Sequence, residues 1–166
     1  MTALTIWVGI DPGEKGAIAF LSPEGVVDIW DMKDPALTAA LFRDTAQNYS
    51  HMYVAIEGQG SRPSQSSVST FSQAESFGVL KGILYALEIP FEAISPQAWK
   101  KQLRIPAGKG DTPLAKRKDG KKKSMEAAEA MFPKAELRGS RGGALDGRAE
   151  ALLIAEAIRQ IKTGQA

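Results

Sequence analysis

The stretch WVGIDPGEKGAIAF, Trp7–Phe20, decides the fold class of this chain. An apolar run at 4–10 ends at Asp11, Pro12 and Gly13, and such a continuous run is typical of a strand buried on both faces. A second apolar run at 16–21 predicts another strand after a tight turn. Because an ionised carboxylate is costly to bury, Asp11 at the end of a buried strand indicates a neutralising charge nearby.

The remaining pattern predicts an α/β domain with a five-stranded mixed sheet flanked by helices. After the turn signal SPEG, a third strand at 26–32 completes an antiparallel meander of the first three strands. Two further strands, at 51–58 and 91–94, alternate with helical patterns, so the sheet is not purely parallel. We predict helices at 35–47, 67–88, 97–103, 123–132 and 145–161.

Length and composition favour a single domain spanning residues 1–166. The chain has no cysteine, which excludes disulfides and cysteine-ligated zinc. The first residues lack a basic region, and their apolar run is too short for a signal peptide or a spanning helix. We therefore expect a soluble, cytoplasmic protein with no membrane partner.

Positive charge is concentrated in one segment. Residues 100–123 hold ten Lys or Arg and two Asp, a net charge of +8, which leaves −6 on the rest because the whole chain carries +2. This asymmetry favours a polyanion partner such as DNA, and the alternative is a solvated surface loop. The part at about 104–122, rich in Gly, Pro and Lys, is predicted to be a basic DNA-binding loop with no core of its own. The candidate DNA-binding residues here are Lys100, Lys101, Arg104, Lys109, Lys116, Arg117, Lys118, Lys121, Lys122 and Lys123.

Three further carboxylates accompany Asp11, and one of them repeats its pattern. Glu57 ends a predicted strand in VAIEG, again after buried apolar residues and before a glycine. Asp146 and Glu150, in LDGRAEALLIAEAI, are four residues apart and therefore share one helix face. The same face continues with Leu and Ala, which predicts that both acids point inward.

Four inward carboxylates at the ends of elements need a positive charge, and a hard divalent cation, Mg²⁺ or Mn²⁺, supplies it through oxygen ligands. Two such ions about 4 Å apart can hold the attacking water and the leaving oxygen of a phosphodiester. Each acid also has a simpler interpretation. Asp11 can be part of a plain turn, Glu57 a solvent-exposed strand end, and Asp146 the N-cap of the last helix.

Five motifs in chain order carry a family resemblance: VGIDPGEKGAIAF, VAIEG, ISPQAWKKQL, KKKSMEAAEAMFP and LDGRAEALLIA. Together they resemble the RuvC-type Holliday-junction resolvases, on the RNase H-like fold, and the compact chain resembles the phage or prophage branch. The resemblance spans nearly the whole chain. GIDPG alone also resembles ATP-binding relatives on this fold, whereas the ordered set of acids with lysines between them is more specific.

This resemblance implies a crossover junction endodeoxyribonuclease, a hydrolase of DNA recombination and repair that resolves four-way junctions by paired symmetric nicks. It implies that the four acids are catalytic ligands of two Mg²⁺ or Mn²⁺ ions per active site, with no nucleotide cofactor, and that the products carry a 5′-phosphate and a 3′-hydroxyl. It also implies a homodimer packed through the helix at 67–88, and phosphate contacts by Lys100 and Lys123.

The chain departs from the family pattern in two places. We expect two ligands three residues apart on the last helix, whereas Asp146 and Glu150 are four apart with a glycine at 147. The basic loop is longer than expected, and its glycines predict that it orders only on DNA. Arg62, in the loop 59–70 after the Glu57 strand, is a further DNA-binding candidate, either entering the junction centre or lying on a mobile surface loop.

Three alternatives stay open to different degrees. An ATP-binding domain of the actin or sugar-kinase type needs a second domain, for which the chain is too short. A non-catalytic DNA-binding module explains the basic segment but leaves the four acids without a purpose. A broader branched-DNA or RNase H-like nuclease without junction preference fits the same residues, because the sequence does not distinguish these substrates.

Overall fold

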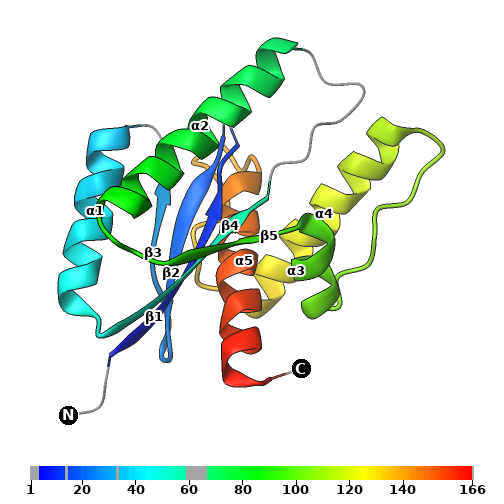
Figure 1. Ribbon diagram of the computed structural model, residues 1–166. Helices are drawn as coiled ribbons and strands as arrows, with labels where there is room; N and C mark the ends of the chain where they lie inside the picture. Colours follow the sequence, from blue (N-terminus) through cyan, green and yellow to red (C-terminus); the bar gives the residue numbers. More distant parts are fainter. Residues whose placement is uncertain (1–3, 14, 33, 59–66, 166) are drawn as a thin grey trace.

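The computed structural model describes residues 4–13, 15–32, 34–58 and 67–165 and forms one sheet with helices on both sides (Figure 1). The strands are β1 Thr5–Asp11, β2 Ala17–Ser22, β3 Gly25–Asp31, β4 His51–Glu57 and β5 Phe91–Ile94. The helices are α1 Pro35–Asn48, α2 Ser67–Ala86, α3 Pro96–Gln102, α4 Pro113–Met131 and α5 Asp146–Thr163.

The sheet has five strands in the order β3-β2-β1-β4-β5. β1 pairs antiparallel with β2, and β2 pairs antiparallel with β3. β1 pairs parallel with β4, and β4 pairs parallel with β5. The predicted five-stranded mixed sheet, with its first three strands antiparallel, is therefore confirmed.

Alternate residues of the strands enter two separate cores, as the two-residue period of a strand requires. Ile6, Val8 and Ile10 of β1 pack with Phe42 of α1 and with residues of α2. Trp7, between them, joins the other core, which α5 dominates. Figure 1 shows the same arrangement, with α1 and α2 on one side of the sheet and α5 on the other. β1 is the central strand, so its carboxyl end lies between elements of both layers.

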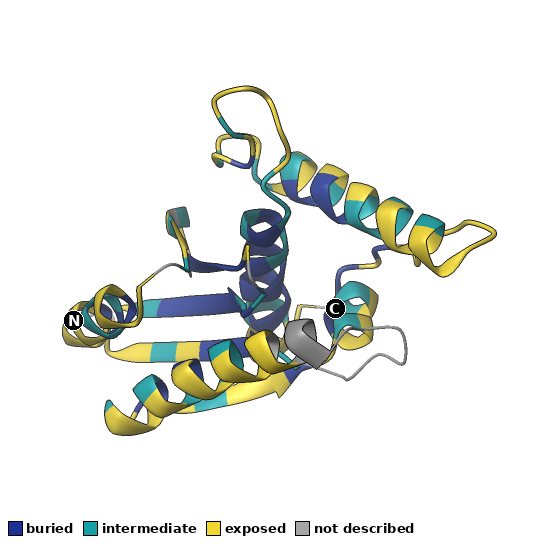
Figure 2. Cartoon of the chain, turned by 90° about the horizontal axis from the view of Figure 1, so that it is seen from above, coloured by how far each residue is buried: buried dark blue, intermediate teal, exposed yellow. Residues whose placement is uncertain are grey.

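Burial differs sharply between the two C-terminal helices. Figure 2 shows α5 buried along most of its length, whereas α4 extends away from the sheet with much of its surface exposed. A run from Ala151 to Ile158 is buried continuously, as expected for a helix enclosed by the sheet and its neighbours. None of the helices in the described ranges is long and apolar enough to cross a bilayer.

The predicted starts of two helices are confirmed by their capping bonds. Asp34 accepts a hydrogen bond from the N–H of Ala36 at 2.7 Å, with Pro35 as the first residue of α1. Ser95 accepts one from the N–H of Ala98 at 3.1 Å and begins α3. Both helix starts follow the local rule that an N-cap Asp or Ser followed by Pro begins a helix.

The predicted loop at 104–122 is wrong in its second half, because α4 begins at Pro113. Thr112 caps this helix by accepting a hydrogen bond from the N–H of Ala115 at 3.1 Å, and Pro113 occupies its first turn. Ala, Leu, Lys and Arg are strong helix formers, so the charge of this segment does not prevent a helix. Gly120 is a single unfavourable residue within the helix, and the helix continues through it. Only residues 104–112 form a loop.

This shorter loop packs against α4, and the expectation that it orders only on DNA stays a prediction. The Lys109 N–H donates to the Asp119 carboxylate at 2.7 Å. At Gly108 the two backbones lie so close that an added Cβ would be 1.9 Å from the carbonyl oxygen of Lys116. The loop and the first turns of α4 therefore form one basic unit.

Candidate active site

Two of the predicted acids end adjacent parallel strands. In the register of β1 and β4, Ile10 lies opposite Ile56, and Asp11 and Glu57 follow directly in each strand. Because parallel strands point the same way, their carboxyl ends meet at one edge of the sheet. Asp11 is fixed there by a hydrogen bond from the Gly13 N–H to its Oδ1 at 3.1 Å, an Asx turn.

Glycines let α5 lie directly on the end of β1. A Cβ added at Gly9 would be 2.1 Å from the carbonyl oxygen of Ala151, and one added at Gly147 would be 1.9 Å from that of Lys15. Any side chain at either position would therefore push the helix away from the strand and its turn. This close approach carries the first two turns of α5, with the remaining two acids, to the end of β1.

Asp146 is not the N-cap of α5. The cap residue is Leu145, which makes no side-chain cap bond, and Asp146 is the first residue of the helix itself. Its Oδ2 accepts a charge-assisted hydrogen bond from Lys121 Nζ of α4 at 2.9 Å. The simpler interpretation of Asp146 as a cap is therefore wrong, and the side chain is turned toward the basic helix.

Glu57 is held by a buried tryptophan. Trp99 of α3 is fully buried, and its Nε1 donates to Glu57 Oε2 at 3.0 Å. A buried indole N–H usually has an acceptor, and the sequence carries no other signal of this partnership. Trp99 therefore fixes the orientation of Glu57.

Burial and mutual repulsion raise the pKa values of Asp11, Glu57 and Glu150. Burial raises the pKa of Glu57 to about 7, and the nearby charges of Glu150 and Asp11 add to this rise. Burial likewise raises the pKa of Glu150, with Asp11 as the next cause. Burial also raises the pKa of Asp11, which Asp146 raises further, while the Gly13 N–H and Lys121 lower it. The four carboxyl groups thus lie within electrostatic reach of one another.

The donor set suits a hard divalent cation, although the side chains are not closed around one. Within the described residues, no three His, Cys, Asp or Glu side chains are grouped closely enough to hold a metal ion. Carboxylate oxygens from three elements, partly buried and mutually repelling, are nevertheless the ligands that Mg²⁺ and Mn²⁺ prefer. A cation bound here would need to draw the carboxylates toward itself.

Comparison with solved structures agrees with this fold. RuvC of Thermus thermophilus in complex with a Holliday junction substrate superposes with a TM-score of 0.58 at 15% identity, over 98% of both chains. A second Thermus thermophilus RuvC structure superposes with a TM-score of 0.55 at 16% identity, again over 98% of both chains. The chain has the fold of the RuvC resolvases. The yeast mitochondrial Holliday junction resolvase Ydc2 gives 0.49 at 18% identity, over 99% of this chain and 82% of its own.

No protein-family model matches the sequence, and no curated protein matches it significantly. The RuvC-like fold is RNase H-like, so the predicted fold class is confirmed. The phage or prophage branch stays a prediction, as do the roles of the acids.

All the predicted DNA-binding residues except Arg62 lie on α3, α4 and the loop between them. Exposed among them are Lys101, Arg104, Lys109, Lys116, Arg117, Lys118 and Lys122. Lys100 is partly buried, with its Nζ 4.9 Å from the centre of the Trp99 ring, and its charge lowers the pKa of Glu57. Arg62 lies outside the described residues.

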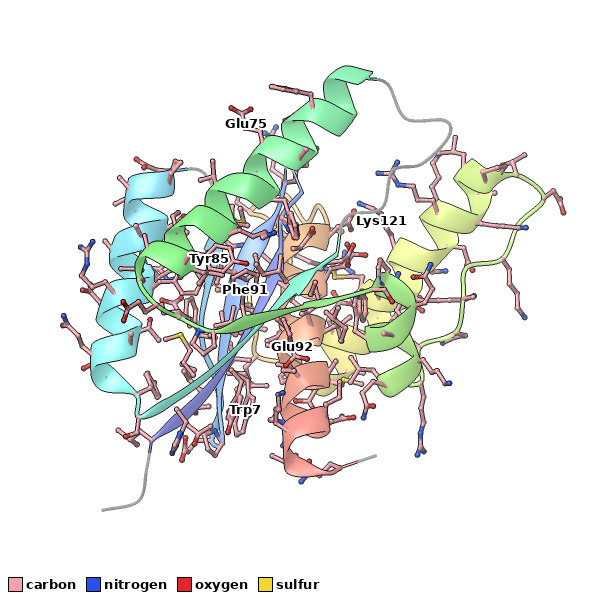
Figure 3. All side chains as sticks on the ribbon, in the orientation of Figure 1. Trp7, Glu75, Tyr85, Phe91, Glu92 and Lys121 are labelled. Atoms are coloured by element: carbon pink, nitrogen blue, oxygen red, sulfur yellow. The ribbon has the colours of Figure 1, made fainter. Side chains whose placement is uncertain are left out.

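Of the two lysines that the resemblance implies as phosphate contacts, Lys100 and Lys123, the second is directed elsewhere in this structure. Lys123 Nζ is engaged away from the acids, donating to the Ala107 carbonyl at 2.8 Å and pairing with Asp119 at 2.6 Å. Lys121 instead reaches the acids. Figure 3 shows its side chain on the face of α4 that is turned toward the end of the sheet.

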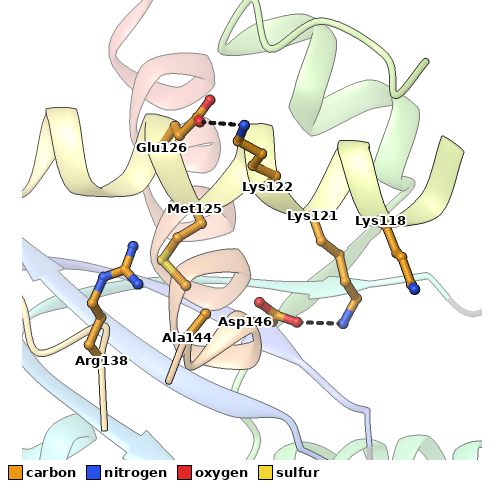
Figure 4. A pocket seen from close by; sticks show the side chains of 8 residues that line it. All are labelled: Lys118, Lys121, Lys122, Met125, Glu126, Arg138, Ala144 and Asp146. Atoms are coloured by element: carbon orange, nitrogen blue, oxygen red, sulfur yellow. Dashed lines mark hydrogen bonds and ion pairs between the residues drawn. The ribbon is translucent and has the colours of Figure 1, made fainter. Parts of the chain in front are cut away.

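A groove of about 420 Å³ continues from Asp146 along α4. Its lining is Lys118, Lys121, Lys122, Met125, Glu126, Arg138, Ala144 and Asp146 (Figure 4). Arg138 was not among the predicted site residues. It belongs to the LRGSRGG segment, whose position next to α4 is set by the fold and carries no sequence signal. Of the four predicted acids, Asp146 lines this groove.

Proposed function

We propose that this protein is a metal-dependent endodeoxyribonuclease that resolves four-way DNA junctions by paired symmetric nicks, leaving 5′-phosphate and 3′-hydroxyl ends. The observation that carries the proposal is the cluster of partly buried carboxyl groups from β1, β4 and α5, placed beside a strongly basic helix and loop. A cytoplasmic location, with access to DNA, goes with this function.

The four acids have distinct supports within the proposed site. Asp11 ends the central strand of the sheet, and its charge raises the pKa values of both Glu57 and Glu150. Glu57 is oriented by the buried Trp99 indole, and Asp146 and Glu150 are carried by α5. We propose that these residues hold two Mg²⁺ or Mn²⁺ ions. Bound there, such ions supply a water of lowered pKa and stabilise the departing 3′ oxygen of a phosphodiester.

The basic residues would hold the DNA backbone beside the acids. The loop 104–112 and the first turns of α4 present lysines and arginines on one continuous unit, and the groove along α4 leads to Asp146. Such phosphate contacts give binding that weakens steeply with salt. They position DNA without reading its sequence.

We also propose a homodimer, since paired symmetric nicks require two active sites. α2 supports this, because it exposes Phe71 by 71%, Tyr85 by 67% and Val79 by 40%. Exposed large apolar side chains on one helix mark an interaction surface, and a second copy of this chain is the partner that the proposed reaction needs. Figure 3 shows Tyr85 beside Phe91, their ring centres 5.1 Å apart, at the far end of this helix.

The test is a cleavage assay with Mg²⁺ on synthetic four-way, three-way and linear duplexes that share one labelled strand. We expect paired nicks at symmetric positions of the four-way substrate and little cutting of the linear one. Asp11→Asn should bind the four-way junction yet not cut it, with Asp44→Asn, an exposed acid on α1, as the matched control. Equal cutting of all three substrates would favour a broad nuclease, and full cleavage by Asp11→Asn would reject the proposed site.

A further inference from the structure

Lys121 is a cation that the fold places directly against Asp146. Its Nζ lies 2.9 Å from Asp146 Oδ2, and the two side chains are 37% and 36% exposed (Figure 4). Its charge also acts on Asp11 and Glu150, whose carboxyl groups repel Asp146. Lys121 therefore neutralises part of the charge of a whole cluster, not of one partner alone.

The neighbouring lysines do not share this position. Lys122 pairs with Glu126 at 3.8 Å on the same helix, and Lys123 is bound to Asp119 and to the loop backbone. The helical rotation of about 100° per residue points the three consecutive side chains in three directions. Among these three, Lys121 alone faces the acids.

We propose that Lys121 is an internal counter-ion that competes with the divalent cation for Asp146, and that its displacement by the cation frees it to bind a phosphate of the DNA. The inference rests on the proposed metal site, and it gives Lys121, one of the predicted DNA-binding lysines, a further role toward the metal ion. Lys121 is here a positioning residue, since it acts on the metal through Asp146.

Two physical features suit Lys121 to this exchange. The ion pair is more than one-third exposed, so it is weak enough for a doubly charged ion to replace it. The lysine stem is long and flexible, which lets the ammonium group move into the adjacent groove while the helix stays in place. A cation at the acids and a phosphate in the groove then favour each other's binding, because the cation releases the lysine that the phosphate needs.

The test is calorimetric titration of Mn²⁺ into the DNA-free protein, a readout independent of cleavage. Lys121→Met removes the charge and keeps the length and helix propensity of the side chain, and we expect it to bind Mn²⁺ about five-fold more tightly or better. Lys121→Arg keeps the charge and should stay within about two-fold of the original chain. Lys122→Met, which removes the same charge one residue along, is the matched control for metal affinity and should also stay within that range. Thermal melts check that all variants fold.

The outcomes separate the inference from the proposed function. If Lys121→Met binds Mn²⁺ no more tightly than the original chain while Asp11→Asn loses binding, the metal site stands and the counter-ion role is overturned. Equal tightening by Lys121→Met and Lys121→Arg also overturns it, because the effect is then steric. If Asp11→Asn binds Mn²⁺ as well as the original chain does, the proposed site and the inference both fail.

Discussion

Replacing Glu57 by Gln should stabilise the metal-free protein above neutral pH. The folded chain holds the Glu57 carboxyl at a pKa of about 7, against an ordinary value of 4.5. Between these two values the folded state binds the proton more tightly than the unfolded state, so the free energy of unfolding falls as the pH rises from about 4.5 to about 7. Gln carries no charge and keeps an oxygen that accepts the Trp99 N–H. The Glu57→Gln protein should therefore not lose this stability as the pH rises.

The size of the effect follows from the pKa shift. The pKa of Glu57 shifts from 4.5 to about 7, and each unit corresponds to about 1.4 kcal/mol. Glu57→Gln should therefore raise the free energy of unfolding by at most about 3 kcal/mol. For a chain of 166 residues this corresponds to a rise in melting temperature of roughly 6–12 °C at pH 8 in EDTA. Near pH 4.5 the difference between the two proteins should vanish.

The assay is urea unfolding in EDTA at intervals between pH 4.5 and 8.5. Glu75→Gln is the matched control, because Glu75 is exposed on α2 (Figure 3) and far from the acids in the chain. Adding Mg²⁺ at pH 8 should stabilise the original chain but not Glu57→Gln. A Glu57→Gln protein that is less stable than the original at pH 8, or whose difference does not change with pH, would refute the reasoning.

Two other predictions concern the backbone contacts that build the site. Gly9→Ala should lower the free energy of unfolding by about 3 kcal/mol or more, since the new Cβ would lie 2.1 Å from the Ala151 carbonyl oxygen and cannot be accommodated by a side-chain rotation. Urea unfolding checks this, and a loss below about 1 kcal/mol contradicts it. Gly108→Ala should push the basic loop from α4 and weaken junction binding in EDTA about five-fold or more, measured by fluorescence anisotropy. Gly120→Ala adds a Cβ only in ordinary contact, 3.8 Å from the Gly108 Cα, and should leave binding unchanged; equal affinities for both variants would contradict the role of the loop.

The elements that carry Asp11 and Glu57 could be predicted from the sequence because each strand is a continuous apolar run ending in an acid and a glycine. Strand pairing followed from the short turn at 22–25 and the helical crossovers. The sequence prediction did not find the start of α4 at Pro113. The high Lys and Gly content of the segment favours a loop, whereas Thr112 followed by Pro113 is a local signal for a helix start.

Other features of the site depend on contacts between distant residues and could not be predicted. Lys121, Lys122 and Lys123 are equivalent in sequence, and only the rotation of α4 relative to α5 decides that Lys121 meets Asp146. The bond between Trp99 and Glu57 joins residues 42 apart in the chain. The groove beside Asp146 likewise arises from the packing of α4 against a segment with no motif of its own.

The central claim is that acids from β1, β4 and α5 together bind divalent cations. Its most direct test is an anomalous difference map from crystals of the protein soaked in Mn²⁺. The account predicts anomalous peaks bounded by the carboxylates of Asp11, Glu57, Asp146 and Glu150, and none there in Asp11→Asn crystals. Manganese bound only elsewhere on the protein, or peaks at the acids that persist in Asp11→Asn, would contradict it.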